Sequence, residues 1–95
     1  MKVNELHDAL KPVSALAMFS GDEGKVISIQ ILKNEVLKEH ITKVPALLLC
    51  ITGEVVFENE EGEKKTLNTG DYVHIEPMVK HWVVANEDSQ LVLTK

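Results

Sequence analysis

Residues 67–81 read LNTGDYVHIEPMVKH, and this stretch decides the fold. Gly70 and Asp71 supply turn chemistry, and the apolar residues Val73 and Ile75 then alternate with polar ones, as in a half-buried strand. A second turn follows before His81. A single imidazole holds a metal ion poorly, so the stretch raises the question of which other residues could join His81 as ligands.

Short runs rich in Val, Ile, Leu and Thr recur along the chain, separated by turn segments such as SGDEG, TGE and NEDS. We expect strands at Val13–Phe19, Lys25–Lys33, Ala46–Ile51, Val55–Glu58, Lys64–Leu67, Asp71–Ile75, His81–Asn86 and Gln90–Thr94. Helical spacing occurs only in Met1–Leu10, where Asn4 could cap a short helix. Many short strands with almost no helix predict an all-β antiparallel sandwich or barrel, preceded by a short helical or irregular N-terminal segment.

Composition limits both the organisation and the partners of the chain. With 95 residues, 44% of them hydrophobic, we expect a single domain over 1–95, with the barrel core at about 25–95. The net charge of -5 argues against binding to nucleic acid or to an anionic membrane surface. The N-terminus lacks a secretory signal and no segment is apolar enough to span a membrane, so we expect a cytoplasmic protein.

Two strands are apolar on both faces. Every residue of Ala46–Ile51 is apolar, and the strand that begins at His81 continues with Trp82, Val83, Val84 and Ala85. An antiparallel strand with one solvated face usually alternates, so the outer faces of these strands need a cover. We expect a homodimer to provide it, and the alternative is that the first ~20 residues fold over that face.

Two groups of residues with a distinctive spacing lie between Asn34 and Asn86. The first group is Asn34, His40, Thr42, Ala46 and Gly53. The second group is Gly70, Glu76, Met78, His81 and Ala85. Their spacing resembles the double motif of the cupin family, which are small β-barrels of the jelly-roll, or double-stranded β-helix, type. The resemblance implies that fold for this chain.

The resemblance also implies a metal site with part of its ligands missing. In metal-binding cupins, two histidines and a glutamate of the first motif join the histidine of the second around one divalent ion. His40 and His81 match two of these positions, whereas Thr42 and Ala46 stand at the others. Two neutral imidazoles could hold Zn, Ni, Fe, Mn or Cu weakly, with water completing the coordination shell.

Strand alternation predicts what else faces the interior. If Ala46 points inward, so do Leu48 and Cys50, and if His81 points inward, so do Val83 and Ala85. With His40 and Thr42 these residues would line an apolar pocket for an unidentified small molecule. The alternative is a barrel filled by its own side chains. His74 lies on the strand face opposite Val73 and Ile75, and we expect it, like His7, at the surface.

Three functions remain open at this stage. The first is a small-molecule-binding or sensing protein, dimeric and non-catalytic, with a weakly held metal at His40 and His81. The second is a metal-dependent cupin enzyme of the oxygenase or isomerase class with an incomplete ligand set. The third is a structural or interaction domain whose barrel is filled. Whether the chain is an enzyme is left open.

Overall fold

Nine strands and one short 3₁₀ helix make up the computed structural model, which describes residues 1–95. The elements are η1 (Val3–Leu6), β1 (Val13–Ser20), β2 (Lys25–Ile31), β3 (Val36–His40), β4 (Ala46–Thr52), β5 (Glu54–Asn59), β6 (Lys64–Asn68), β7 (Tyr72–Ile75), β8 (His81–Ala85) and β9 (Ser89–Thr94). The eight expected strands are all present, and β3 is an addition that the sequence pattern did not predict.

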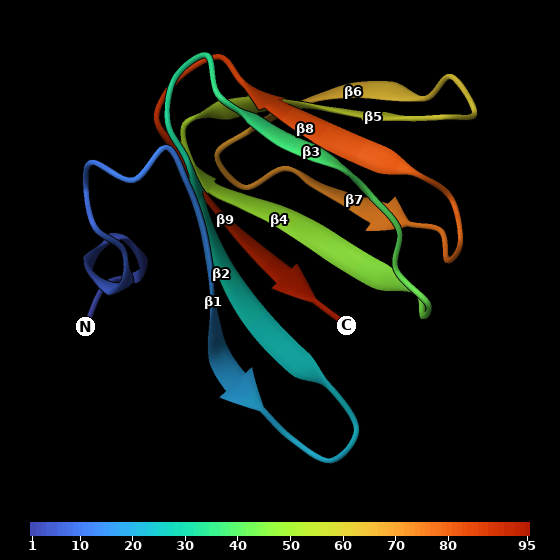
Figure 1. Ribbon diagram of the computed structural model, residues 1–95, viewed down its shortest axis with the longest axis horizontal. Helices are drawn as coiled ribbons and strands as arrows, with labels where there is room; N and C mark the ends of the chain where they lie inside the picture. The colour runs from blue at the N-terminus through green and yellow to red at the C-terminus, as the bar shows by residue number, and fades with distance from the viewer.

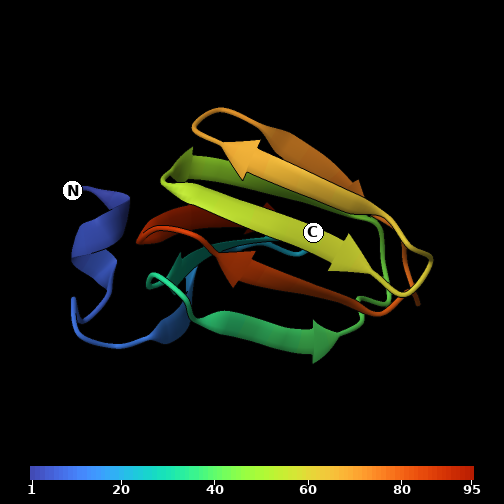
Figure 2. The same cartoon turned by 90° about the horizontal axis from the view of Figure 1, so that it is seen from above.

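The strands form two antiparallel sheets that face each other; in Figure 2 the smaller sheet lies in front and strands of the larger sheet lie behind it. The five-stranded sheet has the order β1-β2-β9-β4-β7, and the four-stranded sheet has the order β3-β8-β5-β6. The hairpin of β1 and β2 extends beyond the other strands at the lower end of Figure 1. This arrangement confirms the all-β, jelly-roll prediction.

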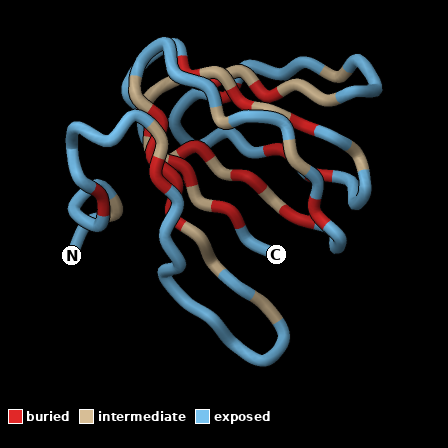
Figure 3. The backbone as a smooth tube through the Cα atoms, in the orientation of Figure 1, coloured by how far each residue is buried: buried red, intermediate tan, exposed pale blue.

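The core fills the space between the sheets, where Figure 3 shows the buried residues at alternate positions along the strands. In β4, Ala46, Leu48 and Cys50 are buried while the residues between them are only half-buried. The buried apolar residues form one cluster: Ile29, Ile31, Ala46, Leu48, Cys50, Val55, Phe57, Leu67, Val73, Ile75, Val83, Ala85, Leu91 and Leu93. Burial of every second residue is expected when the inward side chains of two antiparallel sheets pack against each other.

Gly53 joins the two sheets where the chain passes from β4 to β5. Its φ of 93° lies in the region that favours glycine. A Cβ at this position would lie only 2.5 Å from the Asp88 carbonyl oxygen, so the connection between β8 and β9 packs directly on it. The Glu54 N–H donates to Ser89 Oγ at 3.1 Å across the same contact. Glycine is therefore needed both for its conformation and for its size.

The N-terminal segment differs from the sequence prediction in two respects. Asn4 does not cap a helix, because it lies within η1, which has no side-chain cap. His7 is not a surface residue, since only 8% of it is exposed. Its Nδ1 lies 2.7 Å from Ser14 Oγ and its Nε2 lies 2.9 Å from Ser28 Oγ. These two hydroxyls satisfy both ring nitrogens and so allow the imidazole to be buried.

The same segment covers the outer face of the larger sheet at β1 and β2. The side-chain amide of Gln30 donates to the carbonyl oxygens of Asp8 at 2.8 Å and Lys11 at 3.0 Å. On β4, the outward residues Leu47, Leu49 and Ile51 remain half-buried. The expected homodimer stays a prediction at this point.

Candidate functional site

His40 and His81 lie side by side on neighbouring strands of the smaller sheet. They are direct partners in the β3–β8 pairing, and their ring centroids are 4.0 Å apart with the planes inclined by 62°. A β-bulge between Leu37 and His40 makes this possible. In a regular ladder Glu39 would stand opposite His81, so the extra residue turns His40 toward it.

Both imidazoles have the same tautomer. Nδ1 of His40 lies 2.9 Å from the Lys38 carbonyl oxygen, and Nδ1 of His81 lies 3.3 Å from the Val79 carbonyl oxygen. A carbonyl oxygen only accepts hydrogen bonds, so each Nδ1 must donate its proton. When such a ring carries no second proton, its Nε2 atom has a free lone pair.

Burial keeps His81 neutral. Only 2% of His81 is exposed, and the ring of Phe57 stacks on it with centroids 5.7 Å apart. The pKa of His81 is lowered, first by burial and then by the neighbouring His40, while the hydrogen bond to Val79 acts in the opposite direction. A neutral imidazole is the form that binds a metal ion.

Thr42, the residue at a lost ligand position, carries an unusual hydroxyl. The residue is 3% exposed, yet its Oγ1 has no hydrogen-bond partner. A buried polar atom without a partner is costly, and it often marks a place where a water or an ion belongs. Thr42 follows His40 by two residues, so its hydroxyl is a candidate third donor beside the two Nε2 atoms.

The other predicted interior residues belong to the core. Ala46, Leu48, Cys50, Val83 and Ala85 are all part of the buried cluster. The Cys50 thiol lies 3.6 Å from the Thr52 carbonyl oxygen, and burial raises its pKa. A thiol with a raised pKa is a poor nucleophile, so Cys50 fills space in the core.

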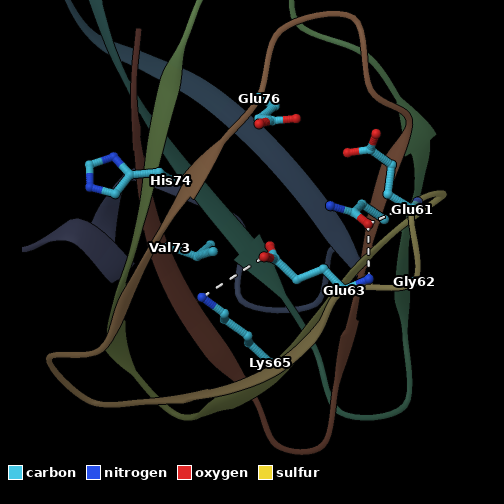
Figure 4. A pocket seen from close by; sticks show the side chains of 8 residues that line it. Glu61, Gly62, Glu63, Lys65, Val73, His74 and Glu76 are labelled. Atoms are coloured by element: carbon cyan, nitrogen blue, oxygen red, sulfur yellow. Dashed lines mark hydrogen bonds and ion pairs between the residues drawn. The ribbon is translucent and has the colours of Figure 1, made fainter.

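A polar surface hollow with a volume of about 590 Å³ lies between the β5–β6 hairpin and β7 (Figure 4). It is lined by Asn59, Glu61, Gly62, Glu63, Lys65, Val73, His74 and Glu76. Asn59 is the β5 partner of His81, but neither His40 nor His81 lines this hollow. The carboxylate of Glu76 is the main reason that the pKa of Glu61 is raised. No three His, Cys, Asp or Glu side chains are arranged to hold a metal ion.

His74 lies where the sequence places it, exposed on the outer face of β7. The sequence analysis did not identify Phe57, which stacks on His81, or Asn59, which pairs with His81 in the sheet. A signal for both was available, because Val55, Phe57 and Asn59 alternate along the same strand and so share the face that turns inward.

The model of the cupin domain family matches residues 28–94, most of the chain. Among solved structures, a cupin superfamily protein from Desulfitobacterium hafniense superposes with a TM-score of 0.86 at 15% identity, covering 98% of this chain and 84% of that one. An RmlC-like cupin from Shewanella frigidimarina gives a TM-score of 0.80 at 21% identity, covering 92% of this chain and 78% of that one. KdgF from a Halomonas species gives 0.79 at 21% identity, with coverage of 96% and 88%.

At these identities the solved structures establish the fold alone. No protein of curated function matches the sequence. None of the helices in the structure has the length and apolar character needed to cross a membrane.

Proposed function

The chain belongs to the cupin family, and from this premise we propose that it is a small-molecule-binding or sensing domain built around His40 and His81. In this proposal the two Nε2 atoms hold a divalent transition-metal ion weakly. The bound ion would supply a Lewis-acidic point of attachment for an oxygen or nitrogen atom of the ligand. Water and ligand atoms would take the remaining coordination positions.

One observation carries the proposal: both Nδ1 atoms are engaged by backbone carbonyls in rings only 4.0 Å apart. A second hydrogen bond from the far nitrogen is how metal-binding histidines are usually oriented. The lowered pKa of His81 also favours the metal over the competing proton near neutral pH.

Binding suits this site better than catalysis. Catalytic zinc sites generally use about three protein ligands and keep one position open, whereas this chain offers two imidazoles and one hydroxyl. No carboxylate hydrogen-bonds either imidazole to orient it as a general base.

Metal titration of untagged protein tests the proposal. We expect Zn²⁺ or Ni²⁺ to bind with one-to-one stoichiometry by calorimetry, and we expect His40→Gln and His81→Gln each to abolish the binding. His74→Gln is the matched control, since it removes an exposed imidazole from β7, a strand of the other sheet, and should leave binding unchanged. Circular dichroism spectra would verify that each variant is folded. Binding that survives in both the His40 and His81 variants would refute the assignment.

A filled, non-binding interaction domain is the second candidate. It is favoured by the burial of Ala46, Leu48, Cys50, Val83 and Ala85 within the core cluster. Wild-type protein that binds neither Zn²⁺ nor Ni²⁺ in the same titrations would support this function instead.

A further inference from the structure

The segment before β1 is anchored to the larger sheet through one buried side chain. His7 is the only buried residue among residues 1–12, and η1 has none. Leu6 is 46% exposed and Leu10 is 85% exposed, and a hollow of about 560 Å³ lies between η1 and β1. Figure 1 shows the segment outside the two sheets, beside β1 and β2. Residues 1–11 thus form a strap whose attachment depends mainly on His7.

The surroundings of His7 suit a neutral imidazole. Ser14 Oγ lies 2.7 Å from Nδ1 and Ser28 Oγ lies 2.9 Å from Nε2, and both serines are themselves buried. A neutral ring donates one of these hydrogen bonds and accepts the other. A protonated ring donates both, so the hydroxyl that previously donated to the ring loses its acceptor. Protonation therefore leaves a buried hydroxyl proton unsatisfied beside a buried charge.

No carboxylate pairs with His7 to offset a positive charge. Burial lowers the pKa of His7, and Lys11 of the strap lowers it further. The Asp8 carboxylate instead accepts a hydrogen bond from the Leu10 N–H at 2.9 Å. β1 has no charged residue, and the one charged residue of β2 is Lys25 at its first position. The other charged groups of the strap are Lys2 and the N-terminal amine with its ion-pair partner Glu5.

The sheet surface under the strap is polar, so its exposure to water costs little. Ser14, Ser28 and Gln30 are buried there, and the Gln30 side-chain amide donates to two carbonyl oxygens of the strap. Beside them Gln90 donates to Gln30 Oε1 at 2.9 Å, while its own buried Oε1 has no partner. Water can hydrogen-bond with each of these groups when the strap is away.

We propose that the strap detaches from the sheet when His7 takes up a proton and docks again when the proton is lost. Pro12 is the hinge, because its carbonyl oxygen accepts a hydrogen bond from the Leu32 N–H at 2.8 Å, which holds the following chain in the sheet. The device is independent of the proposed metal site, since the strap lies on the larger sheet and both His40 and His81 belong to the smaller one.

The direction of the pH dependence follows from the two states of His7. In the released strap the imidazole has its ordinary pKa of about 6.5, which is above that of the docked ring. The released form therefore binds more protons, so the strap is docked above this pH and is released as the pH falls below it. The ratio of released to docked strap rises by up to about tenfold per pH unit, until the docked ring also titrates.

Backbone order measured by NMR tests the proposal on the unaltered protein. At pH 8 the amides of residues 3–10 should give heteronuclear NOE values of an ordered backbone, and at pH 5 those of a mobile chain. The side-chain amide signals of Gln30 should shift over the same range, because they lose both carbonyl acceptors. The amides of β4 and β9 should stay ordered throughout. A strap still ordered at pH 5, already mobile at pH 8, or mobile only together with β4 and β9 would overturn the proposal.

Two variants test whether His7 is the group responsible. The side-chain amide of His7→Gln does not titrate in this range, so its strap should show the same order at pH 8 and pH 5, whether docked or released. His74→Gln is the matched control, since it removes an exposed imidazole from β7 and should keep the wild-type pH dependence. A strap that still loses its order between pH 8 and pH 5 in His7→Gln, or that no longer does so in His74→Gln, would refute the role of His7.

Discussion

Replacement of Gly53 by alanine should destabilise the fold more than any other glycine substitution at a positive φ. The new Cβ would overlap with Ser89 Oγ and would lie 2.5 Å from the Asp88 carbonyl oxygen and 2.8 Å from Ser89 Cα. Two of these neighbours are backbone atoms, so the β8–β9 connection would have to move. Ser89 Oγ would then lose its contacts with the Glu54 N–H at 3.1 Å and the Glu87 carbonyl oxygen at 2.7 Å.

Three contributions add up to the expected loss in the free energy of unfolding of Gly53→Ala. The positive φ costs an alanine about 1–2 kcal/mol. Displacement of packed atoms costs about 1–3 kcal/mol. Loss or distortion of the two hydrogen bonds adds about 1 kcal/mol or more. The total of about 3–6 kcal/mol is a large part of the 5–15 kcal/mol that holds a typical domain together.

Thermal unfolding followed by circular dichroism measures the effect. A loss of about 3 kcal/mol lowers the Tm of a domain of this size by at least about 12 °C. Gly62→Ala is the matched control, because Gly62 has a φ of 87° but nothing within 4 Å of the added Cβ. It should cost only the conformational term of about 1–2 kcal/mol. Equal losses in the two variants would refute the argument that Gly53 is needed for close packing on Ser89.

Two further predictions concern buried polar groups. The pKa of His81 is lowered by burial and by the neighbouring His40, and the pKa of His7 is lowered by burial and by Lys11. Both values therefore lie below the value of about 6.5 in the unfolded chain, so the unfolded chain binds more protons at these two histidines than the folded protein does. The free energy of unfolding, measured in urea, should be greatest above about pH 6.5 and should fall as the pH drops below it. His7→Gln should make this fall with pH less steep. An equally steep fall in the variant would contradict the contribution of His7 to the pH dependence. Thr42→Val removes a buried hydroxyl that has no partner, so it should stabilise the metal-free protein by about 1 kcal/mol while weakening the metal binding proposed above. A destabilised variant with unchanged metal affinity would show that the hydroxyl has a structural partner.

Much of the fold could be predicted because the turn signals are explicit. Gly70 adopts a positive φ at the predicted turn, and Gly53, Asn34 and Met78 adopt one at other positions of the two motifs. The alternation of β4 and β8 predicted that Ala46, Leu48, Cys50, Val83 and Ala85 point inward, and all five are buried in the core cluster.

Strand β3 could not be recognised, because the sequence VLKEH does not alternate. Its bulge puts two residues, Lys38 and Glu39, opposite Trp82 alone, so the period of two is interrupted within a five-residue strand. The prediction that His7 is exposed was wrong for a different reason. Its burial depends on Ser14 and Ser28, and only the antiparallel pairing of β1 with β2 brings those two hydroxyls to the same imidazole.

The bulge in β3 has a consequence for how this chain can vary in length. Loss of one residue from a regular strand turns every following side chain to the opposite face of the sheet. Loss of either Lys38 or Glu39 would instead produce an ordinary ladder, in which Leu37 still meets Val83 and His40 still meets His81. Single-residue deletions within 38–39 are therefore compatible with the paired imidazoles, whereas a deletion between His81 and Val83 would separate them.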